Sequence, residues 1–457
     1  MDTTKNYYET DLETRISKIR EIIDSSDKEV ASQLCEGMHY VDIVEALDNF
    51  EDDEINTFIN LLSFENIAGI LENSWEEMQM LISSFFTRDQ LISIFSYMNN
   101  ADIADLLGVM PTYRRKDILK FMKESESNIL NLILSFDEES AGGIMTTEYI
   151  ALKEHLTVEN ALAKIKDIAP ETEIIEYLFI TDNHHRLKGI VDLRKLLVAP
   201  EDTTLAMLYK EFPFFVYATD DQEKASILIT KYDLDILPVV NKNMAILGII
   251  TSDEIMHVID QEYSEDILVM SGVNKYEEYD SNFFESFKNR IPWLSINMIT
   301  AFIASSVVGL FSSTIETVVA LSAAMPIVAG MGGNAGNQTL SIVLTSLARG
   351  EINLRNNWKL VFKEVGMGIL NGAIVGTITG FILSIKYQNP FLMAIMAASM
   401  VLNMIVAGVA GFLIPLVLDH IHVDPAVSSS IMLTAFTDTC GFFIFLGLST
   451  VFLSNLI

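Results

Sequence analysis

The stretch Pro326-Ile-Val-Ala-Gly-Met-Gly-Gly-Asn-Ala-Gly-Asn-Gln338 lies within a run, Thr317–Ala348, that contains no Asp, Glu, Lys or Arg. A run of this length can cross a membrane as a helix, which needs about 20 apolar residues. Its glycines permit close helix packing, but its three carboxamides are costly in a bilayer unless they find partners or face water. The stretch therefore predicts a membrane helix that lines a polar path; helix packing alone is the alternative.

Four further runs extend this prediction to a five-helix all-α transmembrane domain over residues 291–457. Three of them are free of charged residues: Ile291–Ile315, Val365–Ile385 and Tyr387–Leu418. The fourth, Pro425–Ile457, contains one charged residue, Asp438. No basic residue lies deep in any run, so a passing cation is the best partner for this carboxylate, and a protonated or snorkelling Asp438 is the alternative.

The distribution of charge predicts the orientation of the chain. The formal net charge is −32, and −31 of it falls in residues 1–290. Such an acidic half repels phosphate backbones, which excludes nucleic acid as a partner. Lys288 and Arg290 precede the first run and four basic residues separate the second from the third, so the positive-inside rule predicts a cytoplasmic N-terminus and an outside C-terminus.

The acidic half divides into two kinds of repeat. Apolar residues, with Ser74 standing in once, recur every twelve positions through residues 38–122. This period predicts a superhelical array of short helices over residues 1–137. Two copies of a strand–turn–strand–helix pattern follow, beginning at Tyr177 and Ile236. They resemble a tandem pair of CBS domains, with expected boundaries 138–200 and 201–265. Residues 266–290 are predicted to form a connecting helix whose part from Tyr276 is amphipathic.

The whole chain resembles the MgtE-type magnesium channels. The resemblance rests on Pro326–Gln338, on the sequel Leu344-Thr-Ser-Leu-Ala-Arg-Gly350, on Asp438 within Thr-Asp-Thr-Cys-Gly, and on the order of the domains. It implies a homodimeric Mg²⁺ channel of the plasma membrane, not an enzyme, that mediates uptake and closes when cytosolic Mg²⁺ is high.

The resemblance also implies the site residues. Asp438 would select the ion, and the pore would further include Pro326, Gly330, Gly333, Asn334, Asn337, Ser430, Thr434 and Glu316. Ser430 and Thr434 replace an asparagine and an alanine of many relatives. Regulatory Mg²⁺ would bind Asp102, Asp105, Asp221, Glu223, Asp233, Glu254, Glu262, Glu265 and Asp266, beside a His257 that replaces an aspartate. The resemblance extends to ATP binding through Arg194, which is doubtful because Lys195 and Leu234 depart from the family pattern.

Three other functions are compatible with parts of this pattern. The chain could carry another divalent cation, such as Ca²⁺, Mn²⁺ or Co²⁺, because hard oxygen ligands suit several of these ions. An intramembrane enzyme could use Asp438 as a base, but the runs contain no second deep carboxylate or histidine for acid–base work. A CBS-bearing membrane sensor that moves no ions would leave the polar second run unexplained.

Overall fold

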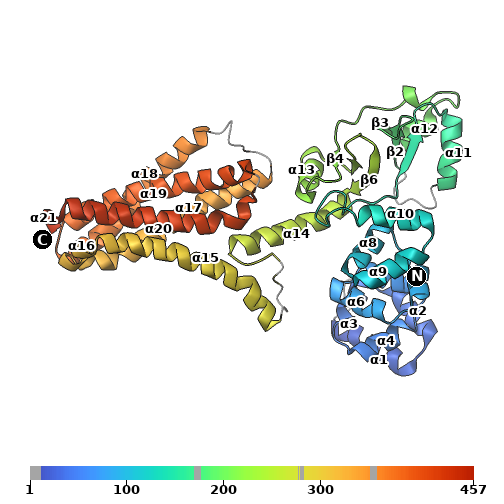
Figure 1. The fold of residues 1–457 in the computed structure, drawn as a ribbon, viewed down its shortest axis with the longest axis horizontal. Coiled ribbons are helices and arrows are strands. Elements are labelled where there is room, and N and C mark those ends of the chain that lie inside the picture. The colour runs from blue at the N-terminus through green and yellow to red at the C-terminus, as the bar shows by residue number, and fades with distance from the viewer. Residues whose placement is uncertain are drawn as a thin grey trace, which may run out of the picture. The chain divides into compact units, whose positions relative to one another are not determined.

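In the computed structural model the chain forms two compact units, Met1–Met256 and His257–Ile457. The structure describes residues 12–168, 176–275, 277, 282–349, 352, 358–421 and 423–456. Figure 1 shows the helical array and the strands of the first unit and the long helices of the second.

The first unit opens with an array of short helices. Their bounds are α1 (Leu12–Ser25), α2 (Lys28–Gly37), α3 (Tyr40–Leu47), α4 (Asp52–Ile59), α5 (Phe64–Glu72), α6 (Glu76–Ser84), α7 (Arg88–Phe95), α8 (Asn100–Val109), α9 (Thr112–Phe121) and α10 (Glu124–Ile133). From α3 to α9 each helix contacts the next but one, in the rows α3–α5–α7–α9 and α4–α6–α8.

The N-caps explain the twelve-residue period. They fall at His39, Glu51, Ser63, Trp75, Thr87, Asn99 and Pro111. The residue before each cap is the repeating position, and six of these seven residues are buried: Met38, Phe50, Leu62, Phe86, Met98 and Met110. The predicted superhelical array is therefore confirmed, with a buried anchor before the N-cap of every helix from α3 to α9 except α6, which follows Ser74.

Two similar α/β repeats follow. Their elements are β1 (Ile150–Lys153), α11 (Val158–Ile168), β2 (Tyr177–Thr181), β3 (Leu187–Asp192), α12 (Leu193–Val198), a short 3₁₀ helix (Leu205–Met207), β4 (Val216–Tyr217), α13 (Gln222–Tyr232), β5 (Ile236–Val240), β6 (Ile246–Thr251) and α14 (Ser252–Met270). Each sheet pairs its first two strands in parallel and its last two antiparallel, in the orders β1-β2-β3 and β4-β5-β6. The two predicted copies are confirmed, each with an additional first strand that the sequence repeat did not reveal.

The predicted connecting helix is not a separate element. Its first residues belong to α14, which ends at Met270, and its last residues belong to α15 (Phe283–Leu310), which continues through Pro292. The expected start at Tyr276 lies outside the described residues. Lys288 and Arg290 are good helix formers, so their charge does not end the helix.

The rest of the second unit is helical. It contains α16 (Ser312–Thr317), α17 (Ala320–Ala348), α18 (Trp358–Tyr387), α19 (Phe391–His420), α20 (Pro425–Val451) and α21 (Leu453–Leu456). In the described part of the chain, four helices are long and apolar enough to cross a membrane, and they lie within α15, α18, α19 and α20. The second predicted span forms α17, whose glycines and carboxamides lower its hydropathy, so the count of five spans stays a prediction.

A row of glycines joins α18 to α19. Gly368, Gly372, Gly376 and Gly380 recur every fourth residue and lie on one face of α18. A Cβ atom built on Gly372 would lie 2.5 Å from the Cα atom of Val401, and the other three would lie within 2.7–2.9 Å of α19 Cα atoms. The two helices therefore pack backbone to backbone, as small residues allow in membranes.

Candidate functional site

The polar stretch of α17 divides into two faces. Pro326, Gly330, Asn334 and Asn337 are exposed and follow a spacing of three or four residues, which places them along one side of the helix. A Cβ atom on Gly330 or on the half-buried Gly333 would meet nothing within 4 Å. Helix packing within this chain therefore does not explain these two glycines.

The opposite face of α17 is packed. A Cβ atom on Gly332 would lie 2.4 Å from Asn403 Nδ2 of α19, and one on Gly336 would lie 3.0 Å from Leu433 Cδ1 of α20. The glycines of the stretch thus serve two purposes: Gly332 and Gly336 admit neighbouring helices, and Gly330 and Gly333 belong to the open side.

Asp438 lies at the midpoint of α20 and is half-buried. Within the described ranges, its carboxylate has neither a hydrogen bond nor an ion pair. A carboxylate at this depth in an apolar helix is costly unless it meets water or a cation. Asp438 is therefore a candidate for contact with water or with a cation.

Three other predicted pore residues have different surroundings. The hydroxyl of Ser430 donates a hydrogen bond to the carbonyl oxygen of Met270, at the end of α14, over 2.8 Å. Thr434 is exposed and donates to the carbonyl oxygen of Ser430 over 2.9 Å. Glu316 is exposed on the short helix α16. The hydrogen bond of Ser430 therefore connects the C-terminal end of α14 to α20, a contact that the sequence does not indicate.

Two polar residues of the membrane helices escaped the sequence reasoning. Asn403 is fully buried in α19 and donates from Nδ2 to the carbonyl oxygen of Val328 over 2.9 Å. Glu364 lies in the second turn of α18 and accepts a hydrogen bond from Thr339 Oγ1 over 2.8 Å. Glu364 lies just before the charge-free run that begins at Val365 and near the start of α18, so it is not a second deep carboxylate.

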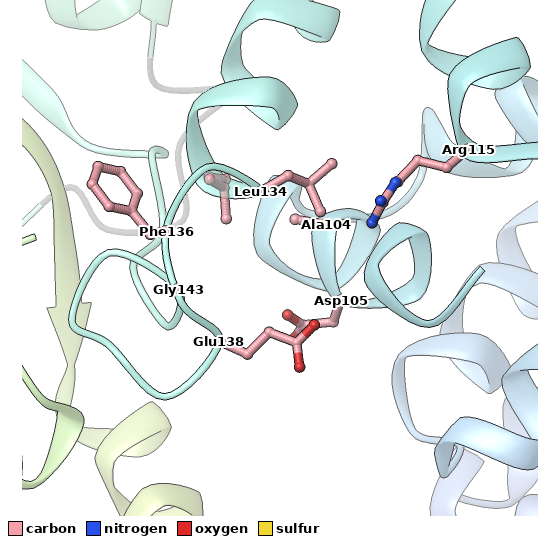
Figure 2. A pocket seen from close by; sticks show the side chains of 8 residues that line it. Ala104, Asp105, Arg115, Leu134, Phe136, Glu138 and Gly143 are labelled. Atoms are coloured by element: carbon pink, nitrogen blue, oxygen red, sulfur yellow. The ribbon is translucent and has the colours of Figure 1, made fainter. Parts of the chain in front are cut away.

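In the first unit, a pocket of about 60 Å³ brings together carboxylates from separate elements. Asp105 of α8 and Glu138, from the segment after α10, both line it, together with Arg115 (Figure 2). Burial, followed by the negative charges of Asp102, Glu254, Glu138 and Glu76, raises the pKa of Asp105 to about 7. The structure thus places three of the predicted metal-binding residues within electrostatic range of one another: Asp102, Asp105 and Glu254. It adds Glu138, which the sequence analysis did not include.

A second acidic group lies in the second unit, near the start of α20. Burial, followed by Asp424 and Glu265, raises the pKa of Asp266 to about 6. Asp424 is the N-cap of α20, where its carboxylate accepts a hydrogen bond from the backbone N–H of Ala426. Lys275 lies 3.4 Å from Glu265 and partly balances the group.

The remaining predicted residues have local contacts. Asp221 caps α13 by accepting from the N–H of Glu223, and Asp233 ends that helix in the left-handed region at φ 51°. Arg194 forms an ion pair with Asp192 over 2.7 Å. Across the described residues, no three His, Cys, Asp or Glu side chains lie close enough to hold a metal ion within one chain.

The raised pKa of Asp105 predicts how stability depends on pH. An acid whose pKa rises from 3.8 to about 7 on folding stabilises the protein fully below about pH 4, and this contribution is lost as the pH rises through 7. Because the side chain of Asp105 is exposed to solvent, screening makes the loss only a fraction of what this shift would mean for a buried group. We expect Asp105→Asn, which stays neutral, to raise the Tm of the full chain at about pH 8 in chelator and to remove this pH dependence.

Thermal unfolding between about pH 5 and pH 8 checks this expectation. Asp53→Asn, at an exposed position of α4, is the matched control and should leave the pH dependence unchanged. A lower Tm for Asp105→Asn than for the wild type at pH 8 would show that the carboxylate is stabilising there.

The chain matches several family models. The MgtE model, described as a divalent cation transporter, matches residues 325–448, the MgtE intracellular N domain matches 38–139, and the CBS domain matches 141–205 and 207–261.

Relatives match over nearly their whole length. A magnesium transporter MgtE of Thermus thermophilus is 30% identical over 449 residues, which cover 95% of this chain and 98% of the relative. A magnesium transporter MgtE of Bacillus subtilis is 29% identical over 400 residues, covering 87% and 88% of the two chains. The crystal structure of the cytosolic domain of the Mg²⁺ channel MgtE in complex with ATP superposes with a TM-score of 0.50 at 27% identity, covering 53% of this chain and 99% of that one. On the polar helix, the CBS pair and these full-length matches together, the chain belongs to the MgtE family.

Proposed function

We propose that this multi-pass membrane protein is a homodimeric channel for Mg²⁺ uptake that closes when cytosolic Mg²⁺ is high. The observation that carries the proposal is Asp438, half-buried at the midpoint of an apolar helix and unpaired within the described part of the chain. The relatives are named as magnesium transporters, not as enzymes.

The open face of α17 supports the proposed contact with a second copy of the chain. Exposed carboxamides at Asn334 and Asn337 cannot face lipid without a large cost, so either water or another copy of the chain must cover them. Two copies related by a twofold axis along this face would bring two Asp438 carboxylates toward one ion path. The proposed orientation keeps the N-terminus in the cytoplasm of a cell whose plasma membrane the helices cross, with the C-terminus outside.

The chemistry of the face suits Mg²⁺. This ion prefers octahedral oxygen coordination and gives up its waters reluctantly, so a path of carboxylate, carboxamide and hydroxyl oxygens can bind the hydrated ion through its waters. Other divalent cations share these hard ligands. Flux of Mg²⁺, Ca²⁺, Mn²⁺ and Co²⁺ into liposomes that contain the purified protein tests the proposal, and Mg²⁺ should cross fastest. Co²⁺ or Mn²⁺ flux that equals or exceeds Mg²⁺ flux would favour the alternative that the protein carries another divalent cation.

Closure is proposed to depend on the acidic groups of α14. Asp266 of α14 lies near Asp424, the N-cap of α20. Met270, also in α14, accepts a hydrogen bond from Ser430 of α20. Carboxylates that raise one another's pKa repel when ionised, and a bound Mg²⁺ would relieve this repulsion. Because a ligand shifts an equilibrium only through differential affinity, Mg²⁺ must bind the closed arrangement more tightly.

Replacing Glu254, Glu262, Glu265 and Asp266 together by amides should leave the channel open at high Mg²⁺. We expect the Mg²⁺ concentration for half-closure to rise at least about tenfold, within the range of ordinary coupling energies. Single-channel open probability, with protease protection of residues 250–290, measures the change.

The matched control removes the same number of carboxylates from exposed positions of the helical array, at Asp24, Glu36, Asp48 and Asp53. Its half-closing concentration should equal that of the wild type. Closure of the α14 variant over the wild-type range, or closure without Mg²⁺, would contradict bridging by these residues.

ATP binding is a secondary part of the proposal. Lys195 lies near enough to Lys210 that burial and this second positive charge lower the pKa of Lys195. A polyphosphate would relieve that repulsion, and Arg194 stands next to Lys195 in the chain. Since Asp192 already pairs with Arg194, ATP would have to compete with this ion pair.

A further inference from the structure

Asn403 occupies a position that the proposed ion path does not explain. It lies in α19, the helix that contacts α17, α18 and α20, and its side chain is fully buried. Nδ2 donates to the carbonyl oxygen of Val328 in α17, while Oδ1 is buried without a partner in the described residues. A buried, unsatisfied amide oxygen is costly, so an apolar residue would suit stability better.

Two glycines make room for this side chain, one on α17 and one on α20, which both bear proposed pore residues. A Cβ atom on Gly332 of α17 would lie 2.4 Å from Nδ2, and one on Gly441 of α20 would lie 2.9 Å from Oδ1. Gly332 lies two residues before Asn334, and Gly441 lies three residues after Asp438. The carboxamide is therefore wedged between the backbones of the two helices, within one turn of the residues proposed to meet the ion.

We propose that Asn403 is a positioning residue that fixes the spacing and register of α17 against α20. The expected effect on transport rests on the proposed function. The positioning of α17 against α20 does not, because it concerns only the packing of these two helices. The carboxamide is planar and hydrogen-bonded, so it allows only one separation between the backbones at Gly332 and Gly441. An alanine at position 403 would allow several. The ion path then keeps Asn334, Asn337 and Asp438 at fixed distances, which preorganisation requires.

Asn403→Ala tests the proposal, with Ser399→Ala as the matched control. Ser399 lies one turn earlier in α19, is equally buried, and its hydroxyl also has no partner in the described residues. We expect Asn403→Ala to reduce the maximal Mg²⁺ flux at least about tenfold and to change the ratio of Mg²⁺ to Mn²⁺ flux. Its Tm should stay within about 4 °C of the wild type, since the variant loses one hydrogen bond and also one unsatisfied oxygen. Ser399→Ala should leave both flux and ratio within about twofold of the wild type.

A distance measurement separates this inference from the proposed function. Spin labels at Ile342 of α17 and Phe443 of α20, both exposed, would report the separation of the two helices in the full-length protein diluted with unlabelled chains. We expect a broader distance distribution for Asn403→Ala than for the wild type, and a wild-type distribution for Ser399→Ala. If the wild type moves no divalent cation, the proposed function fails and the distances alone decide the positioning. A wild-type distribution in Asn403→Ala, or equal broadening in both variants, would overturn the inference.

Discussion

Asp438→Asn should abolish Mg²⁺ flux while the protein stays folded. Asparagine preserves the shape of the side chain but removes the charge that attracts the ion at the midpoint of α20. A close pair of unit charges near a protein surface interacts by about 4 kcal/mol, and Mg²⁺ carries two charges. We therefore expect a loss of at least about 100-fold, equivalent to about 2.8 kcal/mol. Flux into liposomes, measured with a Mg²⁺-sensitive dye, provides the test.

Asp419→Asn is the control for Asp438→Asn. It removes the same charge from an exposed residue in the last turn of α19 and should retain wild-type flux. Asp438→Glu, which keeps the charge on a longer side chain, should recover part of the flux that asparagine loses. Near wild-type flux in Asp438→Asn would remove this residue from the ion path.

Gly372→Leu should prevent the membrane helices from assembling. The new Cβ atom would lie 2.5 Å from Val401 Cα, so it meets backbone and no side-chain rotation relieves the clash. Overpacking against flexible side chains costs about 1–3 kcal/mol, and a clash with backbone should exceed that range. The yield of monodisperse protein in detergent and its Tm are the measurements.

Gly366 supplies the matched substitution in the same helix. A Cβ atom there would meet nothing within 4 Å, so Gly366→Leu should give a normal yield and a Tm near that of the wild type. Equal losses from both leucines would mean that any large residue harms α18 and that the glycine row does not hold the helix pair.

The repeats of the soluble half could be predicted because a local rule generates them. Most twelve-residue units contain their own buried anchor and side-chain cap, such as Met98 and Asn99, so the pattern is visible without knowledge of the neighbours. Contacts between side chains that lie far apart in the sequence leave no such local pattern. Glu138 comes near Asp105 only when the segment that follows α10 packs against α8. No spacing of residues in the sequence predicts this contact.

The weight that the sequence reasoning gives to charge explains why it singles out Asp438 and omits Asn403. Asp438 is conspicuous as the one charged residue of its run, whereas an uncharged carboxamide is not. Asn403 is nevertheless the one carboxamide between Phe391 and Leu418, and this isolation was the available signal. The predicted boundary between the connecting helix and the first span is wrong for a related reason, because the charge of Arg290 suggested a break where α15 continues without one.

The packing of α17 has a consequence for biosynthesis. Its glycine face is covered by α19 and α20, which lie later in the chain. At about 5–20 residues per second, the ribosome needs roughly 4–14 s to add the 72 residues from Arg349 through His420 that complete α19. During that interval the nascent α17 has neither of the helices that cover it, and its carboxamides must be accommodated by water or by the insertion machinery.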